Sequence, residues 1–209
     1  DCSEHSDMMF ETFEPSDLNV TFLKTEKRMG PGGARQVGID NSYNSALFFL
    51  DSDDILISPT GLEDMYNILK EEKSDVVSGV TCQVDWVPGE EYETVNEYLW
   101  IPGQGYTQDV HCIMYDREFL LNNNIRFKDI FVTEDADFNY QVVYANPKIA
   151  LYNKRTYLYR RNMPTSIGVE TSYFDKLLCR ILSNLKNGEY RPMSERWYNV
   201  LYADDLHMQ

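Results

Sequence analysis

The sequence predicts an α/β domain with a mostly parallel, doubly wound β-sheet flanked by helices. One observation is the order of its segments, because strand-like and helix-like stretches alternate as right-handed crossovers require. A second is the continuous apolar run 46–50, which is typical of a strand buried on both faces. A third is size: 209 residues, 43% of them apolar, are enough for one α/β domain with a core.

The elements in the first part of the chain follow from local patterns. Residues 19–23 alternate polar and apolar side chains, as in a half-buried strand. The glycines and proline of 30–33 predict a loop over 27–33, and a helix is expected over 34–44. The apolar run 46–50 is then a buried parallel strand.

The later elements combine helix start signals with apolar periodicity. Ser58 suits the N-cap, and Pro59 the first position, of a helix with apolar side chains at helical spacing. Residues 83–110 lack a regular pattern and are expected to form a functional loop. The other expected elements are strand 75–80, helix 116–124, a helix opened by 133–137, strands 149–152 and 155–159 as a hairpin, and an amphipathic helix over 172–185.

Charge and cysteine content narrow the class of protein. The net charge is −15, which disfavours binding to nucleic-acid phosphates. No apolar run reaches the length of roughly 20 residues that a membrane span needs. The four cysteines are far apart, which favours reduced thiols over disulfides or a zinc site. We therefore expect a cytoplasmic protein, either free or peripheral at the inner membrane face.

An acidic turn, Asp51-Ser52-Asp53-Asp54, directly follows the apolar run. In open α/β sheets ligands bind beyond the carboxyl ends of strands, and clustered carboxylates there suit Mg²⁺ or Mn²⁺ bound to a phosphate. An EF-hand calcium loop is excluded, because its glycine and glutamate positions hold Leu56 and Leu62. By itself, the turn is equally well explained as a cap of the next helix.

Several segments in the same order resemble the family-two inverting glycosyltransferases of GT-A fold. The resemblance rests on Gly33-Ala34-Arg35-Gln36 with the strand and acidic turn after it, on Asp1-Cys2-Ser3, on Thr133-Glu134-Asp135, and on Tyr157-Leu158-Tyr159-Arg160-Arg161 followed by Ser166-Ile167. It covers nearly the whole chain. It implies a GT-A catalytic domain over residues 1–169 that lacks its first strand, and a C-terminal helical extension over 170–209 packed on it.

The resemblance also implies an activity: metal-dependent transfer of a sugar, with inversion, from a nucleotide-sugar to a hydroxyl group. A uridine diphosphate sugar is the expected donor, and a glycan or a lipid-linked or protein acceptor receives the sugar, as in polysaccharide biosynthesis. Mn²⁺ or Mg²⁺ is the expected cofactor. The sequence names neither the sugar nor the oligomeric state.

Residue roles follow from the same resemblance. Asp53 is expected to bind the metal directly and Asp51 the metal, its water or the ribose. The nucleotide-sugar is expected to contact Asp1, Arg35, Asp51, Asp53, Arg160 and Arg161. Glu134 and Asp135 are the expected catalytic pair, with Asp135 as the base that deprotonates the acceptor; a helix N-terminus should keep it ionised at neutral pH.

Some interpretations stay open at this point. His111 is a third metal ligand by residue type only, and a structural role is preferred. Trp86, Trp100 and Tyr106 suit stacking on sugars, although aromatic side chains are more often core. The alternative function is a non-catalytic nucleotide- or sugar-binding relative of the same fold, and a hydrolase that releases free sugar is a third.

Overall fold

The computed structural model describes residues 19–85, 94–101, 109–128 and 134–161, and all statements below concern these residues. Their helices are α2 (Gly30–Asp40), α3 (Gly61–Glu71), α4 (Arg117–Asn122) and α5 (Glu134–Tyr144). Their strands are β1 (Ala46–Phe48), β2 (Ile55–Leu56), β3 (Val76–Asp85), β4 (Thr94–Leu99), β5 (Ile113–Asp116) and β6 (Ile149–Arg161).

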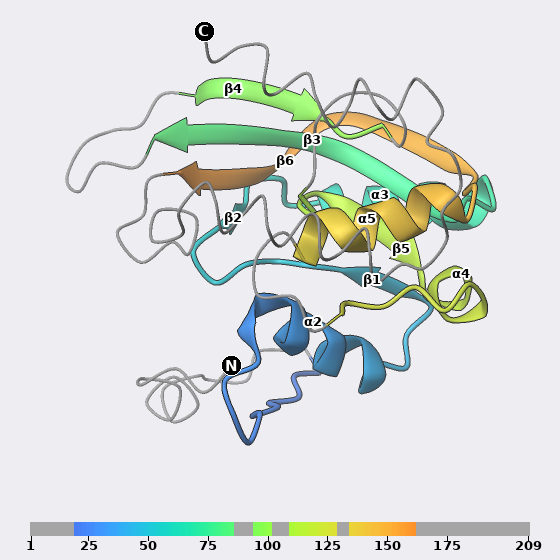
Figure 1. Cartoon of the computed structure of the whole chain (residues 1–209). Coiled ribbons are helices and arrows are strands. Elements are labelled where there is room, and N and C mark those ends of the chain that lie inside the picture. Colours follow the sequence, from blue (N-terminus) through green and yellow to red (C-terminus); the bar gives the residue numbers. More distant parts are fainter. Residues whose placement is uncertain (1–18, 86–93, 102–108, 129–133, 162–209) are drawn as a thin grey trace, which may run out of the picture.

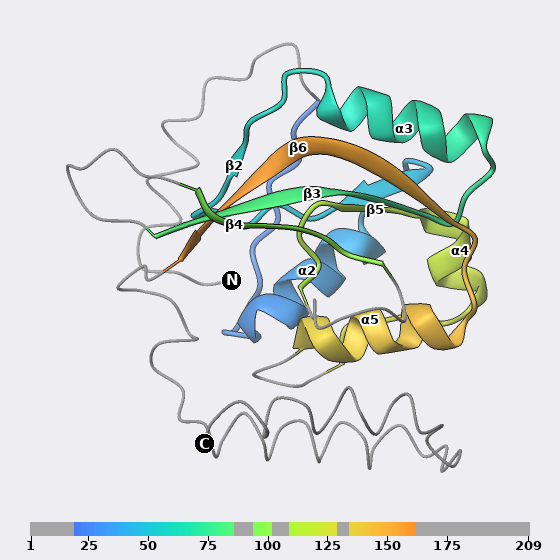
Figure 2. The ribbon, with the colours of Figure 1, turned by 90° about the horizontal axis from the view of Figure 1, so that it is seen from above.

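One sheet with helices on both faces forms the domain, which confirms the predicted α/β class (Figures 1 and 2). Helix α3 covers one face, and α2 and α5 cover the other (Figure 2). The strand order is β1-β5-β3-β6-β2, and β4 pairs with β3. The expectation of a mostly parallel sheet needs correction: β3 and β6 are parallel, but the other described pairs are antiparallel, so the sheet is mixed.

The apolar run 46–50 behaves differently from a doubly buried parallel strand. Its first three residues form β1, which is half-buried and pairs antiparallel with β5. Leu50, at its end, is 48% exposed. Apolar content therefore predicted a strand correctly, but it did not reveal the direction of the neighbouring strand.

Helix α2 begins at Gly30, inside the predicted loop 27–33. Gly30 has a φ of 73°, a left-handed conformation that glycine adopts without strain. Pro31 then lies in the first turn, where its missing N–H costs no hydrogen bond. The glycines and the proline that predicted a break in the helix thus lie at its start.

The later elements match their predictions more closely. In α4 the Asp116 side chain accepts a hydrogen bond from the Phe119 N–H at 3.0 Å, as an N-cap should. In α5 Phe138 and Val142 share a buried face. Helix α3 forms, but it begins at Gly61, after Thr60 rather than Ser58.

The predicted hairpin over 149–159 is instead a single strand, β6, with irregular pairing. Along β3, Gly79 pairs with Tyr152 and Thr81 with Tyr157. Between these pairs, three residues of β6 have no partner of their own in β3: Asn153, Lys154 and Thr156. The break expected between the two predicted strands is therefore a bulged part of one strand.

The remaining differences concern residues 19–23, the irregular stretch 83–110 and the C-terminal region. The strand predicted over 19–23 is wrong, since these residues have no regular secondary structure. Strand β4 was missed within the irregular stretch 83–110. The helical extension predicted over 170–209 lies outside the described residues. Among the described helices, none combines the length and the apolar character that crossing a bilayer demands.

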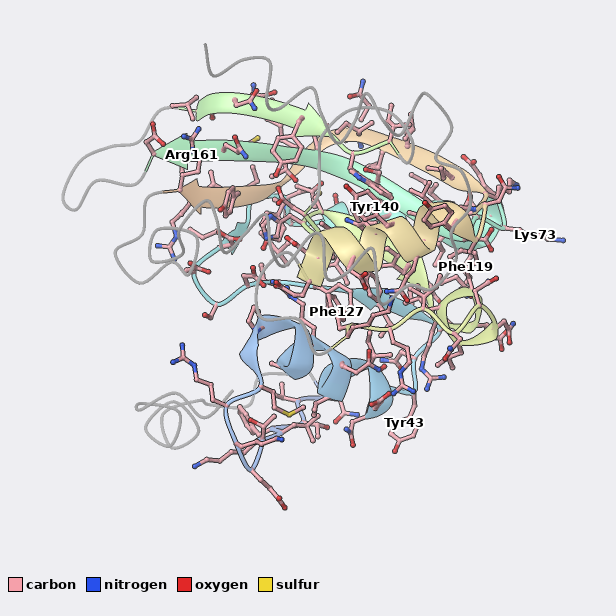
Figure 3. All side chains as sticks on the ribbon, in the orientation of Figure 1. Tyr43, Lys73, Phe119, Phe127, Tyr140 and Arg161 are labelled. Atoms are coloured by element: carbon pink, nitrogen blue, oxygen red, sulfur yellow. The ribbon has the colours of Figure 1, made fainter. Side chains whose placement is uncertain are left out.

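Apolar side chains fill both sides of the sheet. Met65 and Leu69 of α3 pack with Val77 of β3 on one side. On the other, Phe127 and Phe138 stack with ring centroids 4.2 Å apart. Figure 3 shows Phe127 between α2 and α5, and its ring centroid also lies 5.8 Å from Cζ of Arg35 in α2, so this side chain packs between the two helices.

We predict opposite effects on stability for two glycines. A Cβ on Gly79 would lie 2.6 Å from Sγ of buried Cys112 and 3.3 Å from Sδ of Met65. Gly79→Ala should therefore lower the free energy of unfolding by about 1–3 kcal/mol through overpacking. Gly38 in α2 has open space, and Gly38→Ala should raise it by about 0.5–1 kcal/mol. Urea denaturation measures both; an unchanged midpoint for Gly79→Ala would contradict this packing.

Candidate functional site

Acidic side chains from distant parts of the chain meet where β1 and β6 end and β5 begins. They come from the turn 51–54, from the segment 109–111 before β5, and from the first turn of α5. Arg35 of α2 and Arg160 of β6 face the same region. The structure therefore brings together the acidic turn, Glu134, Asp135 and two of the predicted arginines.

Arg35 joins the acidic turn to α5. Its Nη2 donates to both carboxylate oxygens of Asp51, at 2.7 and 2.9 Å, and its Nη1 donates to Oε1 of Glu134 at 2.9 Å. Only 13% of the Arg35 side chain and 9% of the Glu134 side chain are exposed. Helix α2 reaches this position because Gly32 packs on Glu134: a Cβ there would lie 2.8 Å from Cγ of the glutamate.

Asp54 is held on both carboxylate oxygens. The Tyr157 hydroxyl donates to Oδ2 at 2.7 Å, and the Arg160 N–H donates to Oδ1 at 3.0 Å. The side chain has no exposed surface, and burial raises its pKa against the effect of these hydrogen bonds. The Tyr157 hydroxyl also accepts a hydrogen bond from the Asp51 N–H at 3.2 Å. Asp54 and Tyr157 thus set the shape of the turn.

Asp53 differs from both neighbouring aspartates. Its carbonyl oxygen accepts a hydrogen bond from Nε of Arg160. Its half-buried carboxylate has no hydrogen bond or ion pair with any described residue. Of the three carboxylates in the turn, that of Asp53 is therefore available to a ligand or an ion.

His111 lies buried between aromatic rings and carboxylates. Its ring stacks on Tyr157 (centroids 5.1 Å apart) and packs against Tyr159 (4.8 Å). Its Nε2 lies 3.2 Å from Oδ2 of Asp51 and 3.8 Å from Oδ2 of Asp54. Burial alone would lower the pKa of His111, but the hydrogen bond to Asp51 and the nearby carboxylates raise it. The carboxylates around the imidazole therefore favour its protonated form, which reduces the net negative charge of the turn.

His111 and Arg35 together lower the pKa of Asp51. Burial favours the neutral acid, but hydrogen bonds from His111 and Arg35 hold the pKa of Asp51 well below its usual range. Asp51 therefore stays ionised and links α2 to the aromatic rings of β6.

Asp135 is half-buried at the start of α5, and its Oδ1 accepts a hydrogen bond from the Ala136 N–H at 2.8 Å. Burial, then the charges of Glu134 and Asp109, raise the pKa of Asp135 to about 7, while Arg35 opposes them. The expectation that the helix N-terminus keeps Asp135 fully ionised at neutral pH is thus wrong, because burial and like charges outweigh the dipole. A pKa near neutrality suits a group that takes up and releases a proton.

Metal-ligand chemistry is present in the turn. Ligand atoms of Asp51, Asp54 and His111 all lie within 4.8 Å of one another. Mn²⁺ and Mg²⁺ both prefer oxygen ligands such as carboxylates to the nitrogen of an imidazole. Asp54 and Asp51, however, already accept hydrogen bonds on both oxygens, whereas Asp53 does not.

The remaining predicted residues lie in different places. Nε of Arg161 is 3.5 Å from Oδ1 of Asp85, at the half-exposed end of β6. Trp100 is 5% exposed and belongs to the apolar core rather than to a binding surface. Asp1, Trp86 and Tyr106 lie outside the described residues.

Sequence reasoning missed several polar groups in this region. The hydroxyl of Tyr98 donates to Oδ2 of Asp109 at 2.9 Å, and Nδ2 of Asn139 donates to the Asp109 carbonyl at 2.8 Å. Tyr98 belongs to the missed strand, and Asp109 follows a stretch without a regular pattern. Asn139 lies one helical turn after Asp135, which is a signal that periodicity could have supplied.

Comparison with known proteins adds a family and similar folds. The family model described as "Glycosyl transferase family 2" matches residues 1–155. The solved structure of S. aureus TarS 1–349 in complex with UDP-GlcNAc is similar, with a TM-score of 0.67 and 20% identity over 88% of this chain and 55% of that one. The structure of TarS 1–349 in complex with UDP has a TM-score of 0.63 and 22% identity, over 88% of this chain and 53% of that one. No match is found among curated proteins.

These comparisons define the extent of the likeness. The chain spans about half of the length of the similar TarS 1–349 structures. At this identity the likeness shows a common fold, and it agrees with the α/β architecture described above.

We predict that Arg35 is required for stability because it neutralises buried Glu134. Arg35→Met should lower the free energy of unfolding by roughly 3 kcal/mol, the scale found when one partner of a buried pair is removed. Arg35→Met combined with Glu134→Gln should lose less than the sum of the two single changes. Urea denaturation of the four proteins measures the coupling, and strictly additive losses would contradict the ion pair.

Proposed function

Because the chain belongs to glycosyl transferase family 2, we propose that it transfers a sugar from a nucleotide-sugar to an acceptor hydroxyl, with inversion at the anomeric carbon. The observation that carries this proposal is that Arg35 binds both Asp51 of the acidic turn and Glu134, which places the turn beside Asp135, whose pKa is about 7. One end of the site thus suits a charged diphosphate with its ion, and the other suits proton transfer.

The reaction is a single displacement. Asp135 takes the proton of the acceptor hydroxyl as that oxygen bonds to the anomeric carbon, and the bond from this carbon to the diphosphate oxygen breaks with its electron pair. Glu134, held by Arg35, positions the first turn of α5 and does not take up the proton itself. Attack from the face opposite the leaving group inverts the anomeric centre.

The donor is proposed to be a uridine diphosphate sugar. Support comes from the fold shared with TarS, whose structures are described with UDP-GlcNAc and with UDP. Arg160 and Arg161 are proposed to bind the diphosphate, and Asp1 the nucleoside. The acceptor is a hydroxyl of a glycan or of a lipid-linked or protein substrate.

A divalent ion, Mn²⁺ or Mg²⁺, would neutralise charge on the departing diphosphate. The residues fit such an ion, since the free carboxylate of Asp53 and the ionised Asp51 are oxygen donors in one turn. We propose these two as its ligands. In this proposal Asp54 and His111 support the turn, and the set Asp51, Asp54 and His111 is the alternative.

Titration calorimetry with UDP tests the nucleotide and metal site. Binding of UDP should require Mn²⁺ or Mg²⁺. Asp53→Ala should abolish this metal-dependent binding, because it removes the free carboxylate. His111→Gln should keep it at lower affinity. The reverse order of the two variants would move the ion to the alternative set, and absence of metal-dependent binding to any nucleoside diphosphate would refute the proposed function.

The role of Asp135 is tested by transfer rate and its pH profile. A base acts when deprotonated, so kcat/KM should rise with pH and level off above about 7. Asp135→Asn should retain UDP binding and lose transfer by about 10²–10⁴-fold. Glu63→Gln, another acid in the first turn of a helix but outside the site, is the matched control. Binding without turnover in the unaltered protein would instead indicate a non-catalytic relative, and release of free sugar a hydrolase.

A further inference from the structure

Asp109 is half-buried beside His111, and one of its carboxylate oxygens has no partner among the described residues. We propose that Asp109 binds a hydroxyl of the transferred sugar and so helps determine which sugars are accepted; this rests on the proposed function above. None of the sequence patterns indicates this residue, and its role follows from its contacts.

The contacts of Asp109 involve one carboxylate oxygen only. Oδ2 accepts the hydrogen bond of the Tyr98 hydroxyl at 2.9 Å and lies 3.9 Å from Nδ1 of His111, too far for a hydrogen bond. Oδ1 has no partner among the described residues, and 32% of the side chain is exposed. Asp54, in the same site, is bonded on both oxygens and fully buried, as a purely structural carboxylate is.

The position of Asp109 is fixed from two sides. Its carbonyl oxygen accepts a hydrogen bond from Nδ2 of Asn139, and Oδ1 of this asparagine accepts one from the buried Tyr115 hydroxyl at 2.9 Å. Burial and the charge of Asp109 raise the pKa of Tyr98 far above its usual range, so its hydroxyl remains a donor. A carboxylate held this firmly binds a ligand with little loss of side-chain entropy.

Asp109 lies between the two ends of the proposed reaction. Through Asn139 it is one turn of α5 from Asp135, since positions four apart share a helix face. On the other side, the His111 ring separates it from Asp51 in the acidic turn. Asp109 is near both Asp135, whose pKa its charge raises, and His111 beside the turn, so a sugar attached to a diphosphate at the turn would lie close to it.

The chemistry of the group selects the ligand. An ionised carboxylate accepts hydrogen bonds and repels a phosphate, so it suits a neutral ligand with hydroxyl donors. No lysine or arginine among the described residues pairs with Asp109, and its contacts with Tyr98 and His111 involve only Oδ2, so Oδ1 is left to accept such a bond. Because the oxygen is fixed, it distinguishes sugars by the orientation of one hydroxyl.

Calorimetry with UDP and with UDP-sugars, in the presence of Mn²⁺, tests the proposal. UDP alone reports the nucleotide and metal site, and UDP-glucose, UDP-galactose, UDP-GlcNAc and UDP-GalNAc serve as sugar probes. Asp109→Ala should weaken the best UDP-sugar by about tenfold to a hundredfold, the range for a hydrogen bond to a charged group, while UDP affinity stays constant. Tyr98→Phe should act in the same direction more weakly, and Asp40→Asn on the surface of α2 should change neither affinity.

The outcomes separate this proposal from the proposed function. If UDP binds with Mn²⁺ but Asp109→Ala weakens UDP and the UDP-sugar equally, Asp109 has a structural role and the proposal fails. It also fails if no sugar improves on UDP in the unaltered protein. If the unaltered protein does not bind UDP at all, the proposed function itself is overturned. A selective loss for the UDP-sugar, with a different best sugar in Asp109→Asn, supports the proposal.

Discussion

The candidate site depends on one buried cation. A chain with a net charge of −15 places Asp51, Glu134 and Asp135 close together, and such carboxylates repel one another in a low-dielectric region. Arg35 removes most of this repulsion by binding the first two directly. Its position requires α2 to lie against α5, and that contact is possible because Gly32 has no side chain. The packing of two helices and the charge balance of the site are therefore one constraint.

The sequence predicted those parts of the fold and site that depend on neighbouring residues. The acidic turn, the N-cap at Asp116 and the buried face of α5 all arise within a few positions of the chain, so local patterns indicate them. The family assignment is confirmed for the same reason, since its motifs are short segments in a fixed order. Arg35 and Glu134, named from these motifs, indeed meet in space.

The features that were missed depend on long-range contacts. The direction of β1 is set by its pairing with β5, about 70 positions away, and apolar content carries no information on it. The raised pKa of His111 comes from Asp51 and Asp54, about 60 positions away, and from Asp109, whereas the near-neutral pKa of Asp135 comes first from burial. Burial and contacts between distant segments cannot be deduced from the residues next to a position in the sequence, which is why the helix dipole alone gave the wrong expectation for Asp135.

The irregular pairing of β6 determines which way its tyrosines face. Gly79 and Thr81 of β3 are two positions apart and share a face, yet their partners Tyr152 and Tyr157 are five apart. In a regular strand, residues five apart would point to opposite faces. Because the number of unpaired residues between them is odd, the side chains beyond them change to the other face of the strand, and Tyr157 points toward Asp54. Loss or gain of a single residue in this stretch would reverse the orientation of every side chain beyond it, whereas a change of two would preserve it, so the length of this stretch matters more than its composition.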